Sequence, residues 1–170
     1  MSDNPAVADG SRRPLWAPWR IEYIAAPKSG CCFICDKARS GSDEANHVIG
    51  RGRTSFVLLN DFPYNSGHIM VAPYRHVADL TDLTSAELAE VLELVIRGER
   101  MLKQLMGPDG FNFGFNLGAA AGAGLREHVH GHLVPRWVGD TNFMPVLADT
   151  RVVPQALTDT TRLLRAAWGS

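Results

Sequence analysis

The pattern of apolar and polar positions predicts strands, a long helix, further strands and a last helix. Residues 46–60, NHVIGRGRTSFVLLN, hold two β-branched or apolar runs separated by Gly-Arg-Gly, which indicates a hairpin of two strands. Residues 68–73, HIMVAP, form a further short strand that ends at a proline. Residues 110–118, GFNFGFNLG, alternate aromatic and small side chains, as a strand does.

Two segments show helical signals. Thr84-Ser85-Ala86-Glu87 fits a capping box that begins a long helix. After it, apolar residues recur at spacings of three, four and seven and give the helix one apolar face: Leu88, Val91, Leu92, Val95, Leu102 and Leu105. Residues 154–168, PQALTDTTRLLRAAW, predict a C-terminal helix with Pro154 in its first turn. This order favours an α+β fold in which both helices pack on one side of an antiparallel sheet.

Length and composition fit one soluble domain. The chain has 170 residues, of which 45% are hydrophobic and 21% charged, so it can bury a core without disulfides. We expect residues 1–13 to be disordered and residues 14–170 to form a single domain. A net charge of -1 argues against general nucleic-acid binding. No apolar run approaches the roughly 20 residues of a membrane span, and the first residues lack a secretory signal, so we expect a cytoplasmic protein.

Residues 127–137, EHVHGHLVPRW, hold three of the six histidines at alternate positions. In a strand, alternate side chains share one face about 6.6 Å apart, so we expect His128, His130 and His132 to form a row. Such a row can bind a catalytic metal that activates water. Alternatively, one imidazole can act as a nucleophile while its neighbours fix its tautomer and charge. Both alternatives predict an enzyme.

The three cysteines lie together in residues 30–37, GCCFICDK. The number of cysteines is odd and the chain shows no export signal, which argues against disulfide bonds. Cys32 and Cys35 form a C-x-x-C pair, whose spacing fits zinc binding, redox exchange or neither.

Several motifs together resemble the histidine triad family. Residues 128–134, HVHGHLV, match its motif of histidines alternating with hydrophobic residues, with a departure at Gly131. Residues 59–76, LNDFPYNSGHIMVAPYRH, resemble the upstream signature that ends in Gly-His, a strand and Pro-x-x-His. NLGAAAGAG precedes the triad and PRWVGDTNFMP follows it, so the likeness covers about residues 30–157. The combination is most similar to the bacterial branch of diadenosine tetraphosphate phosphorylases.

The resemblance implies an HIT-like α+β fold and a nucleotidyltransferase in which His130 attacks the α-phosphorus of a dinucleoside polyphosphate. His68 would orient this chemistry, His132 would donate to phosphate oxygens, and His128 completes the catalytic set. Inorganic phosphate as acceptor would release ADP and ATP from diadenosine tetraphosphate, whereas water would make the site a hydrolase. A hydrolase of dinucleoside polyphosphates or nucleoside phosphoramidates, and a nucleotide-binding protein without turnover, are the alternatives.

The resemblance also implies which residues bind the substrate. Asn60 stands where the family binds ribose hydroxyls, glycines after Asn116 would let backbone N–H groups approach phosphate, and Trp137 would shape the pocket. The predicted set is Asn60, Asn116, Gly122, Gly124 and Trp137, with Leu58, Leu59 and Phe62 as candidates for the base pocket. The family's Gln-Ser before the triad is absent, which leaves Arg126 or Glu127 as candidate acids.

Zinc-bearing members of the family bind the metal through residues that correspond here to Cys32, Cys35, His76 and His128. Two thiolates and two imidazoles make a closed tetrahedral site, so this Zn2+ would be structural, and Cys31 could substitute for one thiolate. No organic cofactor is implied. The family likeness further implies a nucleotide and phosphate as ligands, and a homo-oligomer, dimer or tetramer, formed through the long helix or the tryptophan-rich N-terminal segment.

Overall fold

The computed structural model describes residues 32–140 and 156–169. Within them, five strands form one antiparallel sheet in the order β1-β2-β3-β5-β4. The predicted hairpin and the strands after it are confirmed, with these bounds: β1 (Val48–Arg51), β2 (Ser55–Leu59), β3 (Ile69–Pro73), β4 (Gly110–Phe115) and β5 (Gly131–Arg136). Every residue of β2 and β3 is buried, because both faces of the sheet are covered at its centre.

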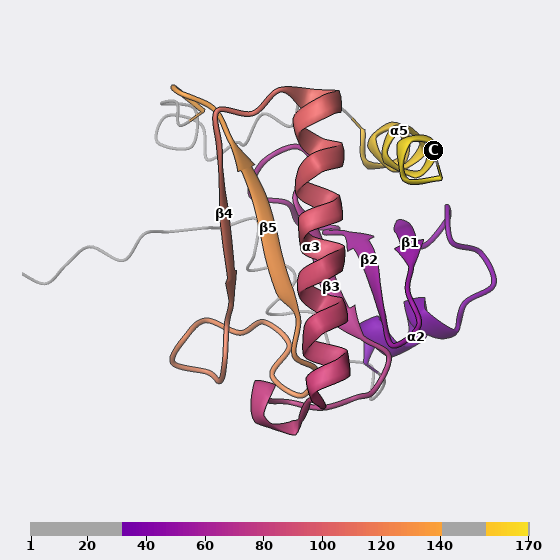
Figure 1. The fold of residues 1–170 in the computed structure, drawn as a ribbon, viewed down its shortest axis with the longest axis vertical. Coiled ribbons are helices and arrows are strands. Elements are labelled where there is room, and N and C mark those ends of the chain that lie inside the picture. Colours follow the sequence, from indigo (N-terminus) through magenta and orange to yellow (C-terminus); the bar gives the residue numbers. More distant parts are fainter. Residues whose placement is uncertain (1–31, 141–155, 170) are drawn as a thin grey trace, which may run out of the picture.

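One face of the sheet packs against the two helices that the sequence predicts. α3 (Ser85–Met106) begins with the expected capping box, in which the Glu87 N–H donates to Thr84 Oγ1 at 3.2 Å. It ends at Gly107, whose φ of 55° is the left-handed conformation that glycine tolerates. α5 (Leu157–Trp168) lies beside the β1 side of the sheet, as Figure 1 shows. Pro154, expected in its first turn, lies outside the described residues.

The opposite face carries a short helix that periodicity did not predict. α2 (Phe33–Arg39) spans the C-x-x-C pair and is too short for an apolar repeat to stand out. Its Ile34 is fully buried against Phe56, Leu58 and Met70, which form a second core separate from the one under α3 and α5. The expectation of α+β architecture with the two long helices on one side is confirmed, and α2 is an addition on the other side. A 3-10 turn, η1 (Leu80–Asp82), precedes α3.

The expected row of three histidines on one strand face is only partly right. β5 begins at Gly131, so His128 and His130 lie in the segment before it and only His132 is within the strand. The segment before β5 does not continue the sheet, because the Val129 N–H donates to the carbonyl of Val77 at 2.7 Å. The backbone therefore turns the three side chains toward different surroundings. Across the described part of the chain, no helix combines the length and apolar character that crossing a bilayer requires.

Candidate active site and metal centre

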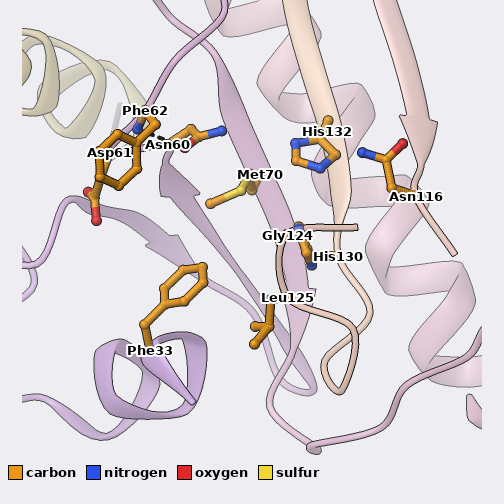
Figure 2. Close-up of a pocket in the computed structure, with 10 residues that line it drawn as sticks. All are labelled: Phe33, Asn60, Asp61, Phe62, Met70, Asn116, Gly124, Leu125, His130 and His132. Atoms are coloured by element: carbon orange, nitrogen blue, oxygen red, sulfur yellow. Dashed lines mark hydrogen bonds between the residues drawn. The ribbon is translucent and has the colours of Figure 1, made fainter. Parts of the chain in front are cut away.

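A cleft opens on the sheet face opposite α3. Figure 2 shows His130, His132 and Asn116 at one end of it, and the rings of Phe33 and Phe62 with the carboxylate of Asp61 at the other. The remaining lining residues come from β3 and from the loop before β5: Met70, Gly124 and Leu125. The cleft therefore has imidazoles and an amide at one end, and aromatic rings beside a carboxylate at the other. This arrangement is suited to a ligand with a phosphate and a base.

The ring of His130 is held in one tautomer by the backbone. Its Nδ1–H donates to the carbonyl oxygen of His128 at 2.8 Å, so Nε2 carries the lone pair. Only 7% of the residue is exposed, and this burial lowers the pKa of His130 below the ordinary value for histidine. The imidazole is therefore neutral at pH 7, which is the nucleophilic form.

His132 is oriented by a chain of donors that begins at the backbone. The Tyr64 N–H donates to Nδ1 of His68 at 3.1 Å, and the amide of Asn60 lies 3.3 Å from the same nitrogen. Nε2–H of His68 must then be the donor to Nδ1 of His132, at 3.0 Å. In a neutral His132 the proton consequently lies on Nε2. His68 thus contacts His132, whereas the sequence analysis expected it to orient the nucleophile.

Some of the predicted binding residues line the cleft and others do not. Asn60, Asn116, Gly124 and Phe62 lie in its wall. The remaining candidates are not among the lining residues: Gly122, Trp137, Leu58, Leu59, Arg126 and Glu127. Leu58 and Leu59 are fully buried, so core packing accounts for them. Gly122 forms an exposed turn with a φ of 79°, and Trp137 follows the end of β5, where its N–H donates to Asp140.

The sequence analysis missed an ion pair that connects α2 to the cleft. Nζ of Lys37 lies 2.8 Å from Oδ1 of Asp61 and also donates to the carbonyl of Asn46. Phe33 and Lys37 on α2 thus approach the cleft from the same helix. No periodic signal marks either residue, because the partners are 24 residues apart and the contact depends on the fold.

Four potential metal ligands meet at the N-terminal end of α2. Cys32, Cys35, His76 and His128 place one ligand atom each within 4.8 Å of all the others. Sγ of Cys32 lies 3.3 Å from Nδ1 of His128, Sγ of Cys35 lies 3.4 Å from Nδ1 of His76, and the two Nδ1 atoms are 3.3 Å apart. Tetrahedral zinc with bonds of about 2.0–2.3 Å places its ligands roughly 3.3–3.8 Å apart, so the donor set fits Zn2+.

The surroundings of these ligands also fit a cation. Nε2–H of His128 donates to the carbonyl of Pro73 at 2.9 Å, which turns Nδ1 toward the thiols. Burial lowers the pKa of His128 to about 4 and raises the pKa of Cys32 to about 11. The imidazole is therefore in its ligand form, and a divalent cation would supply the positive charge that a thiolate requires. The predicted metal site is confirmed as a group of four ligands.

This group of four ligands is distinct from the end of the cleft that holds His130 and His132. It includes His128 but neither of the other two triad histidines, whose Nδ1 atoms are engaged by a carbonyl and by His68. A catalytic metal held by all three histidines does not match this geometry. Both ring nitrogens of His128 are engaged at the metal centre, so its contribution to the cleft is its carbonyl oxygen.

The chain belongs to the HIT, or histidine triad, family, because the HIT domain matches residues 42–138. It is 43% identical over 162 residues to the AP-4-A phosphorylase of Mycobacterium tuberculosis, a match that covers 91% of this chain and 83% of that protein. The asymmetrical bis(5'-nucleosyl)-tetraphosphatase of Schizosaccharomyces pombe is 32% identical over 95 residues, which cover 56% of this chain and 52% of that one.

Among solved structures, the chain resembles a zinc-bound histidine triad family protein from Mycobacterium smegmatis. The TM-score is 0.64 with 27% sequence identity, and the match covers 81% of this chain and 93% of that chain. The HIT-like fold predicted from the sequence is confirmed.

Proposed function

We propose that this protein is a nucleotidyltransferase that cleaves dinucleoside polyphosphates, foremost diadenosine tetraphosphate, through a nucleotidyl-His130 intermediate. The observation that carries the proposal is the buried, neutral imidazole of His130, which lines the cleft and whose Nδ1–H is held by a carbonyl. The similarity to an AP-4-A phosphorylase over 91% of the chain supports the substrate class.

In this proposal the two ends of the cleft bind different parts of the substrate. The base lies between Phe33 and Phe62, the ribose near Asn60, and the α-phosphorus in front of His130. Nε2 attacks the α-phosphorus, the bond from that phosphorus to the bridging oxygen breaks, and its electron pair leaves with ATP. In the second step an oxygen of inorganic phosphate attacks the same phosphorus, the P–N bond breaks, and ADP leaves while His130 regains its lone pair.

His132 assists both steps without transferring a proton. Its Nε2–H is a fixed donor, because the chain from Tyr64 through His68 keeps Nδ1 as the acceptor. Such a donor stabilises the negative charge that gathers on the phosphate oxygens in the transition state. A zinc ion bound by the four ligands would hold α2, and with it Phe33, against the sheet.

The missing Gln-Ser pair fits a polyphosphate leaving group. The terminal ionisation of a phosphate monoester has a pKa near 6, so a departing polyphosphate needs no proton at pH 7. An amine is far more basic, and its departure from a phosphoramidate requires a general acid. Arg126 and Glu127, the candidates for that acid, are exposed and lie outside the lining of the cleft. The site therefore favours dinucleoside polyphosphates over nucleoside phosphoramidates.

Product analysis tests this proposal. Purified protein incubated with diadenosine tetraphosphate and phosphate should yield ADP and ATP in equal amounts, and His130→Ala should yield neither. AMP and ATP formed at the same rate without phosphate would make water the acceptor and the protein a hydrolase. Unchanged diadenosine tetraphosphate under both conditions would contradict an enzymatic role altogether.

We also propose that the protein is a homodimer whose subunits meet through α3 and β4. Among the described strands, β4 is an edge strand that pairs on one side only. Exposed apolar side chains lie on it and on α3 beside it: Phe113, Leu92 and Ile96. Light scattering of the wild-type protein should give twice the monomer mass, and Ile96→Asp should give the mass of one monomer. A monomeric wild-type protein would refute the proposed dimer.

We further propose a cytoplasmic location. It suits the two thiol ligands, because a reducing compartment protects thiols from oxidation.

A further inference from the structure

A second groove begins at His132 and follows β5 and β4 away from the cleft. His132 and Asn116 line both the cleft and this groove, which continues past Gly114 and Asn112 to Arg136. His132, Val134 and Arg136 alternate along β5 and so share one face. Gly114 lies opposite His132 and Asn112 opposite Val134, so the groove runs along the paired strands.

The polar groups of this groove are suited to anions. Among the described residues of its lining, Arg136 is the only one with a formal charge, and none has a carboxylate. Its Nε and one terminal nitrogen donate to Asp140 at 2.6 and 2.8 Å, and the other terminal nitrogen donates to Oδ1 of Asn112 at 3.0 Å. These bonds use three of the five N–H groups of a guanidinium and leave two that bond to no described residue.

The partners of Arg136 also fix where its charge lies. The Asp140 side chain, which is 11% exposed, binds one edge of the guanidinium. The other edge donates to Asn112, which lies opposite Val134, so the guanidinium lies near Val134 along the strand. Two residues of strand separate that level from His132, or roughly 7 Å. Because Asn112 accepts through Oδ1, its amide nitrogen is a further donor. The donors therefore extend beyond the reach of a single phosphate group.

The geometry of in-line displacement at the α-phosphorus indicates which part of the substrate this groove binds. In the proposed function the first nucleoside occupies the aromatic end of the cleft, and the leaving oxygen lies opposite Nε2 of His130. His132 and Asn116 line both the cleft and the groove, so the groove is a continuation of the cleft that a leaving group can enter. We propose that the groove from His132 to Arg136 is the subsite for the phosphates of the leaving group. This subsite rests on the proposed function and deepens it. It names Arg136 as the residue that recognises the phosphates beyond the reacting α-phosphate.

Two substrates with the same reacting centre test the subsite. The p-nitrophenyl ester of AMP forms the same nucleotidyl-His130 but has no phosphates in its leaving group. Arg136→Gln should lower kcat/KM for diadenosine tetraphosphate about tenfold to a hundredfold, as expected for the loss of charge-assisted hydrogen bonds. The same variant should keep kcat/KM for the ester within about threefold of wild type. Equal losses on both substrates, or no loss on either, would overturn the subsite.

A control and a second measurement guard against misfolding. Arg53→Gln removes a guanidinium whose side chain is 87% exposed at the β1–β2 turn, and should leave both substrates unaffected. If Arg136→Gln alone is unstable, the double variant Arg136→Gln with Asp140→Asn replaces it in both assays, because it leaves no carboxylate without its cationic partner. In the wild-type protein, calorimetry should show inorganic tripolyphosphate binding equally well with and without saturating adenosine. Displacement by adenosine, or no binding of tripolyphosphate, would overturn the proposal, whereas failure to cleave the ester would count against nucleotidyl transfer itself.

Discussion

Single hydrogen bonds determine the orientation and tautomer of each triad histidine. His128 faces the thiols because its Nε2–H is held by Pro73, and its carbonyl in turn fixes the tautomer of His130. His132 takes its tautomer from His68. The motifs in the sequence pointed to His130, His132, Asn60, Asn116 and Gly124, which line the cleft, but also to Gly122 and Trp137, which do not. The sequence did not predict these partners, because each hydrogen bond joins segments that only the folded chain brings together.

Replacement of His68 tests whether it positions His132. His68→Ala removes the donor to Nδ1 of His132, and we expect kcat on diadenosine tetraphosphate to fall about tenfold to a hundredfold with little change in KM. His68→Gln keeps an amide donor and should recover part of this loss. Steady-state kinetics of the two variants give the comparison. Wild-type kcat in His68→Ala would show that the contact has no catalytic role.

Gly131, the departure from the alternating triad motif, has a packing explanation. A Cβ at this position would lie 3.1 Å from Cε1 and Cζ of Phe115 and 3.3 Å from Cε2 of Phe113. Two phenylalanine rings thus cover the space that a hydrophobic side chain would fill. We expect Gly131→Val to reduce the free energy of unfolding by about 1–3 kcal/mol through overpacking.

Gly114 provides the control for this variant, since a Cβ there meets nothing within 4 Å. Chemical denaturation should show Gly114→Val close to wild type, and Phe115→Ala should reduce the cost of Gly131→Val when the two are combined. An equal free energy of unfolding for Gly131→Val and wild type would contradict the packing explanation.

At the scale of elements, α2 connects the metal centre to the cleft. Cys32 and Cys35, two of the four potential ligands, lie at its N-terminal end. Phe33 between them lines the cleft, and Lys37 pairs with Asp61 in the cleft wall. The capping box and apolar repeat were sufficient to predict α3, because a helix of 22 residues repeats its pattern several times. α2 has 7 residues, and its place depends on side chains distant in sequence, so no local pattern could reveal it.

Removal of zinc should therefore affect both stability and nucleotide binding. Chelation of purified protein should lower the melting temperature by roughly 10 °C, which corresponds to about 4 kcal/mol for a site well above saturation. The affinity for AMP, measured by calorimetry, should fall in parallel, because Phe33 is no longer held against the sheet. Cys35→Ser should purify without stoichiometric zinc.

Cys31→Ser is the matched control, since the four described ligands already make a tetrahedral set. It should retain zinc in elemental analysis and keep the melting temperature of wild type. Loss of zinc in Cys31→Ser but not in Cys35→Ser would show that the ligand set is wrong.

In the molecule as a whole, the two faces of the sheet differ in function, although both bury apolar side chains. α3 and α5 bury one face in the larger core, while the cleft, the groove and the metal centre lie on the other face. The order of strands and helices was sufficient to predict the α+β class, and the similarity to HIT proteins confirms it. The sheet order β1-β2-β3-β5-β4 was not predicted, because the connection through α3 returns the chain to the far edge before β5 pairs with β3.

In the proposed function, His130 carries the nucleotide covalently. Wild-type protein mixed rapidly with diadenosine tetraphosphate in phosphate-free buffer should gain the mass of one AMP group per chain. Peptide mapping should place that group on His130, and adding phosphate should remove it with release of ADP. No adduct in protein that turns the substrate over, or an adduct on another residue, would contradict the account.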